Sequence, residues 1–89
     1  MHFEFKKAVQ FSLLIKASGR LREFNFRKLK TIDKERFSVD VCNERGDRII
    51  FNMHKLDNEW DIVEDQLPKW ISESKPAIRQ AIEEELRNW

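Results

Sequence analysis

The sequence predicts an α+β domain in which a four- to five-stranded antiparallel meander carries one C-terminal amphipathic helix across one face. Apolar and polar residues alternate with a period of two over much of residues 9–63, and turn-forming residues interrupt this alternation at short intervals. The pattern changes to a helical period over residues 75–88. Period-two alternation is typical of an antiparallel sheet with one buried and one solvated face. A chain of 89 residues has room for a single domain, which we expect to cover residues 1–89.

Five strands are expected, at about residues 9–16, 20–30, 37–42, 48–55 and 60–63. The third has the cleanest alternation, because polar residues separate Phe37, Val39 and Val41. In the second strand Phe24 and Phe26 fall on one side, and we expect that side to face the core.

Three turns fix the expected register of these strands. Residues 18–19 and 57–58 suit two-residue turns, and residues 44–46 suit a three-residue loop with Gly46 in the left-handed conformation. Each turn sets apolar residues opposite apolar residues: Leu13 opposite Phe24, Val39 opposite Phe51, and Met53 opposite Ile62. The connection over residues 32–35 contains neither Gly nor Pro, so its turn type is not specified.

The C-terminal part of the chain reads as helical. Residues 67–71 predict a tight turn or a short helical turn that anchors Trp70, and Ser74 is the expected N-cap of a helix over residues 75–88. The helix has an apolar stripe made of Ile78, Ala81, Ile82, Leu86 and Trp89. Its length of about 21 Å at 1.5 Å per residue is enough to cross four strands spaced about 4.8 Å apart.

The order of core and turn motifs also suggests a relationship. The motifs are Phe51-x-Met53, Trp60-x-Ile62 and Leu67-Pro68-x-Trp70-Ile71, followed by the closing helix. In this respect the chain resembles small uncharacterised bacterial domains of the antiparallel β-meander plus C-terminal helix type. The resemblance implies the fold and carries no activity. In topology alone the chain is similar to the strand-then-helix units of PUR-type single-stranded nucleic-acid binders, none of whose motifs matches particular residues here.

Composition excludes several classes of protein. Two Gly residues are too few for the glycine-rich phosphate-binding motifs, and a single Cys rules out an internal disulfide. The longest aliphatic run, Leu13-Leu14-Ile15, is far shorter than a membrane span. The first residues lack the apolar region of a signal peptide, so we expect a cytoplasmic protein without membrane contact.

The sequence offers no catalytic constellation. Cys42 and His54 form the one candidate thiol–imidazole pair, but the register sets Cys42 opposite Arg48, about 20 Å from His54 at about 3.3 Å per residue. A nucleophile and its base must approach within about 3.2 Å. We therefore expect no catalytic residues and no enzymatic activity.

A metal or cofactor site is equally unexpected. One Cys and two His cannot supply a standard four-ligand zinc site. The spacing Asp57-x-Glu59-x-Asp61 begins like a calcium loop, but Ile62 stands at the Gly position and Pro68 at the position of the bidentate Glu.

Charge is unevenly distributed along the chain. Residues 1–36 carry ten Lys and Arg against four Asp and Glu, a net charge of +6, although the whole chain is only +1. The first hairpin and its end hold the basic residues Lys16, Arg20, Arg22, Arg27, Lys28 and Lys30. This group suits a phosphate backbone, but the inward side of Phe24 and Phe26 leaves no exposed platform for stacking bases.

Two functional hypotheses follow. The favoured one is a non-enzymatic protein-interaction or structural module that binds itself as a homodimer or binds another protein. Its candidate surface is made of apolar residues on the outer side of the sheet: Leu14, Leu21, Leu29, Ile50 and Val63. The alternative is single-stranded nucleic-acid binding through the basic first hairpin.

Overall fold

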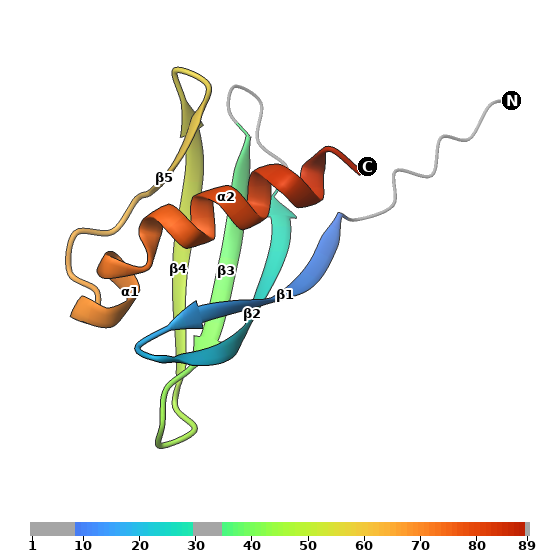
Figure 1. Cartoon of the computed structure of the whole chain (residues 1–89). Coiled ribbons are helices and arrows are strands. Elements are labelled where there is room, and N and C mark those ends of the chain that lie inside the picture. The colour runs from blue at the N-terminus through green and yellow to red at the C-terminus, as the bar shows by residue number, and fades with distance from the viewer. Residues whose placement is uncertain (1–8, 30–34, 89) are drawn as a thin grey trace, which may run out of the picture.

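A computed structural model describes residues 9–29 and 35–88, and its five strands form one antiparallel sheet (Figure 1). The strands are β1 (Gln10–Ala17), β2 (Arg20–Leu29), β3 (Arg36–Cys42), β4 (Arg48–Leu56) and β5 (Glu59–Ile62). Their order across the sheet is their order along the chain, so the sheet is a meander. Two helices follow, α1 (Lys69–Glu73) and α2 (Lys75–Leu86), which confirms the predicted α+β class.

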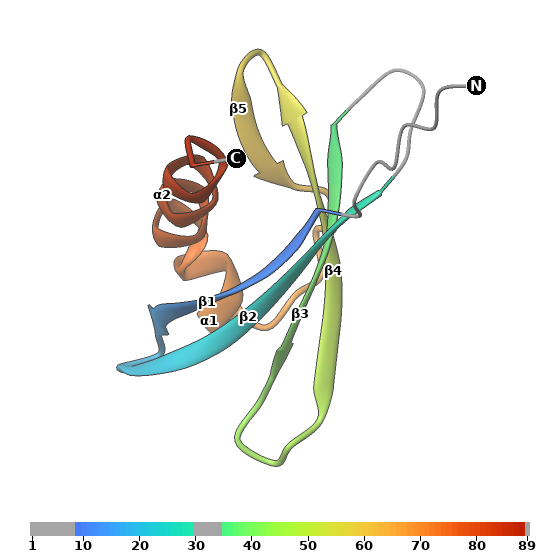
Figure 2. The same cartoon turned by 90° about the vertical axis from the view of Figure 1, so that its right-hand side faces the viewer.

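The sheet is curled into a half-barrel, and α2 lies along its open side. Figure 2 shows α2 nearly end-on, between β1 on one side and β5 on the other. The helix approaches these two strands, the first and last of the sheet, more closely than the three between them. The predicted packing of the C-terminal helix across one face of the sheet is confirmed. Twist and coiling curl the sheet, so the helix lies closest to its first and last strands.

The core fills the space between the curled sheet and α2. Aromatic rings form its centre: Phe37 meets Trp60 edge-to-face with ring centroids 5.2 Å apart, and Phe11 stacks on Phe26 at 5.0 Å. Ile78 and Ile82 of α2 are completely buried against them. Phe24 and Phe26 are also buried, as predicted, so neither ring is available to a ligand.

All three predicted turns are confirmed. Ser18 and Gly19 have φ values of 55° and 78°, and Asp57 and Asn58 have 51° and 67°, so both turns have positive φ at the two central residues. Gly46 has a φ of 83° in the β3–β4 loop. The predicted pairs are present: Leu13 with Phe24, Val39 with Phe51, and Met53 with Ile62. Residues 30–34, which include Lys30 and most of the uncertain connection, lie outside the described residues.

The helical part differs from the prediction in three details. Residues 69–73 form the separate helix α1, and α2 ends at Leu86 rather than at residue 88. Ser74 precedes α2 as expected but does not cap it, because its hydroxyl donates to the carbonyl of Trp70 at 2.6 Å. The cause is that α1 runs into α2 through this one residue, which keeps a helical backbone conformation. Trp89 of the predicted stripe lies outside the described residues.

The β1–β2 turn contains an avoidable strain. Ser18 adopts a left-handed conformation that Asn tolerates better than Ser. We expect Ser18→Asn to raise the free energy of unfolding by up to about 1 kcal/mol, measured by urea denaturation. Ser72→Asn, at an exposed position of α1, is the control and should bring no gain. Equal effects of the two substitutions would contradict this explanation.

Candidate interaction surface

A chain of polar side chains crosses the outer face of the sheet, the face turned away from the core. The hydroxyl of Ser12 donates to Asn25 Oδ1 at 2.6 Å, and Asn25 Nδ2 donates to Asp40 Oδ1 at 2.9 Å. Arg48 then donates to the second oxygen of Asp40 at 3.0 Å. We call these four residues the polar ladder. It links β1, β2, β3 and β4, and it fixes side chains that would otherwise move freely in water.

The ladder also sets the charge state of Asp40. Partial burial by itself raises the pKa of this carboxyl, but hydrogen bonds from Arg48 and Asn25 and the charges of Arg48 and Arg27 outweigh it. The pKa of Asp40 therefore lies below its ordinary value. A second carboxyl, Asp61 on β5, has a lowered pKa because Lys75 of α2 donates to it at 3.0 Å.

The predicted apolar residues are exposed on the outer face, but they form two pairs and not one patch. The exposed fractions are 67% for Leu14, 64% for Leu21, 59% for Ile50 and 36% for Val63. Leu14 and Leu21 are diagonal neighbours across β1 and β2. Ile50 is a diagonal neighbour of Val63, whose N–H donates to the carbonyl of Asn52 at 2.9 Å. The polar ladder crosses the sheet between the two pairs.

The fifth predicted residue lies apart from both pairs. Leu29 is half-buried at the end of β2, opposite Arg36. Sequence reasoning missed Leu56, which is exposed at the end of β4 beside the last turn. The same alternation that placed Ile50 on the outer face would have found it, since the two residues are six positions apart on one strand.

The structure does not bring the predicted basic residues onto one face. Along β2, Arg27 shares the outer face with Asn25. Arg20, Arg22 and Lys28 alternate with these residues and lie on the other face of the strand, the one that carries Phe24 and Phe26. Lys16 on β1 is exposed on the outer face. The group is therefore divided between the two sides of the hairpin.

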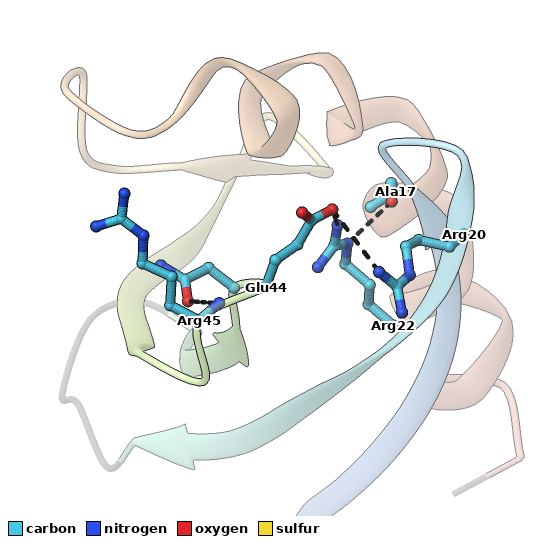
Figure 3. A network of polar contacts seen from close by, with 6 residues as sticks. Ala17, Arg20, Arg22, Glu44 and Arg45 are labelled. Carbon is cyan, nitrogen blue, oxygen red and sulfur yellow. Dashed lines mark hydrogen bonds and ion pairs between the residues drawn. The ribbon is translucent and has the colours of Figure 1, made fainter.

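Arg22 is held by three partners inside the protein. Its Nε donates to the carbonyl of Ala17 at 3.0 Å, and its Cζ lies 4.6 Å from the ring centroid of Trp70 on α1. Its third contact is a 3.2 Å hydrogen bond to Glu44 in the β3–β4 loop. Figure 3 shows Glu44 reaching toward β2, where Arg20 is the second cation near it at 3.7 Å. Only 9% of the Arg22 side chain is exposed, so it is a structural residue as much as a surface cation.

The catalytic and metal candidates from the sequence remain apart. Cys42 is paired with Arg48, and His54 lies six residues further along β4, opposite Arg36, as the register predicted. Within the described ranges, no three His, Cys, Asp or Glu side chains are grouped so as to hold a metal ion. In the same ranges, neither helix has the length and apolar character needed to cross a membrane.

Comparison with known proteins gives no relative: no family model, no curated protein and no solved structure matches this chain. The resemblance expected from the core motifs thus extends only to the architecture, a small antiparallel meander with a C-terminal helix.

The contacts of Arg22 predict a clear difference between the two cations near Glu44. Arg22→Ala leaves the carbonyl of Ala17 without its side-chain donor and uncovers Trp70, so we expect a loss of about 2 kcal/mol in unfolding free energy. Arg20→Ala removes only an exposed ion pair and should cost much less. Chemical denaturation measures both changes, and equal losses would refute the structural role of Arg22.

The lowered pKa values predict an acid-sensitive contribution to stability. Because the folded-state pKa values of Asp40 and Asp61 lie below their ordinary 3.8, the ionised carboxyls stabilise the fold above that pH. This contribution is lost as the pH falls through the lower folded-state values. Asp40→Asn should therefore lower the unfolding midpoint at pH 7, and the gap from the native protein should close below pH 3.8. Asp65→Asn, at an exposed position, removes the same charge and is the control for the change in net charge.

Proposed function

We propose that this protein is a non-enzymatic protein-interaction module and that it binds through the outer face of its sheet. The observation that carries the proposal is the Leu14–Leu21 pair. Two large aliphatic side chains lie next to one another with about two thirds of each exposed, on strands whose other face is buried. Adjacent exposed apolar side chains bordered by polar residues are typical of a protein-binding surface.

The arrangement of the outer face supports a single interface that includes both apolar pairs. A standard interface takes about 800 Å² from each partner, and the protein exposes 6857 Å² in total. Neither the Leu14–Leu21 pair nor the Ile50–Val63 pair alone supplies so large an area. An interface of that size would span both pairs and the polar ladder between them, and the hydrogen bonds of the ladder would hold the pairs at a fixed separation.

Single-stranded nucleic-acid binding is the weaker alternative. The division of the basic hairpin between two faces removes the continuous track of cations that a phosphate chain requires. Arg22 is largely buried, and the inward position of Phe24 and Phe26 leaves no stacking surface on β2.

The double variant Leu14→Gln, Leu21→Gln tests the proposed surface. Both side chains are exposed, so the variant should fold with nearly native stability. If the partner is a second copy, sedimentation equilibrium at micromolar concentration should give a dimer for the native protein and a monomer for the variant. Leu56→Gln is the matched control, because Leu56 is exposed but lies outside both pairs, and it should leave self-association intact.

If the native protein is a monomer, cross-linking in a cell extract replaces sedimentation as the measurement. A captured protein should be lost with the double variant and kept with Leu56→Gln. Absence of both self-association and leucine-dependent capture would refute the proposed surface. Tight binding of a single-stranded oligonucleotide at low salt, weakened by Arg27→Glu, would favour the alternative instead.

A further inference from the structure

The sheet forks where β2 leaves β3. Pairing between these strands covers Asn25–Leu29 of β2, so Arg20–Phe24 have no strand beside them on that side within the described residues. Figure 1 shows the β1–β2 hairpin turning away from the β3–β4 hairpin. A cleft of about 310 Å³ lies in the fork, with Leu21 and Glu23 on one wall and Cys42 and Glu44 on the other.

Within the described residues, the wall formed by β2 has backbone hydrogen-bonding groups that no strand pairs with. The turn pairs Ala17 with Arg20, and Lys28 donates its N–H to the carbonyl of Val9 on the β1 side at 2.8 Å. Backbone groups alternate in direction along a strand, so Leu21 and Glu23 direct their N–H and C=O groups away from β1 and toward the cleft. This is the edge geometry to which an extended peptide adds as a strand.

The same cleft holds a preformed site for a carboxylate. Arg22 is oriented by Ala17 and Trp70, and its Nη2 and the Nη1 of Arg20 converge on one oxygen of Glu44, at 3.2 Å and 3.7 Å (Figure 3). Glu44 itself is 67% exposed. The Glu44 carboxylate therefore pairs with both arginines while its own side chain stays mostly exposed. A carboxylate from a partner can replace it without disturbing the core.

The loop presents Glu44 in a fixed position. The side-chain oxygen of Asn43 accepts hydrogen bonds from the N–H groups of Arg45 and Asp47, both at 2.9 Å. Gly46 completes the turn with its positive φ. Because the turn is ordered by these contacts, the glutamate acts as a built-in competitor for the arginine pair.

We propose that the fork binds an extended acidic segment of a protein partner. The segment pairs its backbone with Leu21 and Glu23, and one of its carboxylates takes the place of Glu44 between Arg20 and Arg22. The observations favour a peptide over a nucleic acid, since the backbone N–H and C=O groups that Leu21 and Glu23 direct toward the cleft match those of another peptide strand, which a phosphate chain lacks. This inference rests on the proposed interaction function and names its partner class.

Two ten-residue peptides test the proposal, one alternating threonine with glutamate and its twin alternating threonine with glutamine. We expect the glutamate peptide alone to bind, as measured by anisotropy of a dye on the peptide. Removing the internal competitor with Glu44→Gln should tighten binding about threefold to fivefold, the scale of an exposed ion pair. Arg20→Gln should weaken it by a similar factor, and Glu59→Gln, at an exposed position on β5, should leave it unchanged.

Cys42 provides a second, independent measurement. It is the single cysteine of the chain, it is exposed, and it lines the cleft. Bound glutamate peptide should slow its alkylation severalfold, whereas the glutamine peptide should not.

Three results would overturn the proposal: equal binding of the two peptides, no tightening with Glu44→Gln, or no protection of Cys42. Preferential binding of a single-stranded oligonucleotide would also overturn it. None of these depends on Leu14, so the fork can fail while the outer-face interface survives, and the reverse also holds.

Discussion

The structure depends on one constraint: every second residue of five adjacent strands must point into the same enclosed space. A shift of one residue in any pairing would exchange buried Phe37, Val39 and Val41 for their polar neighbours. Three short turns prevent this shift, because their positive φ values fix the number of residues between strands. The rings of Phe37 on β3 and Trp60 on β5 are in contact only when the β3–β4 and β4–β5 pairings are correct.

Helix α2 supports this arrangement at both edges of the half-barrel. Ile78 and Ile82 fill the centre of the core, and Arg79 donates to the carbonyl of Trp60 on β5 at 2.8 Å. Lys75 adds an ion pair with Asp61 on the same strand. The helix thus supplies one hydrogen bond to the backbone of an edge strand and an ion pair to its side chain, which limits unwanted pairing with other chains at that edge.

The strands and their register were predictable because their determinants are local. Gly19, Gly46 and the Asp57–Asn58 pair specify turns, and alternation alone then decides which residues are buried. The curl was not predictable in this way, since it depends on twist accumulated over the whole sheet. The side-chain bond of Ser74 to Trp70 also escaped prediction, because it follows from how closely α1 joins α2.

The candidate surfaces were predictable to a smaller extent. Alternation placed Leu14, Leu21, Ile50 and Val63 correctly on the outer face but gave no measure of the distance between the pairs. The same alternation already divides Arg22 from Arg27, so the split of the basic hairpin was within reach. The stacking of Arg22 on Trp70 was not, since it joins residues far apart in sequence through the packing of α1.

The fork also separates the tips of the β1–β2 and β3–β4 hairpins, which lie in solvent, from the tightly packed interior. The turns at Ser18–Gly19 and around Gly46 lie at its two tips, and beyond their chain neighbours neither glycine has an atom within 4 Å of where a Cβ would stand. Insertions that add the same number of residues to both strands of a hairpin would lengthen it, keep its register and leave the interior unaltered. The reach of the two hairpins can thus diversify, by evolution or by design, while the hydrophobic interior stays the same.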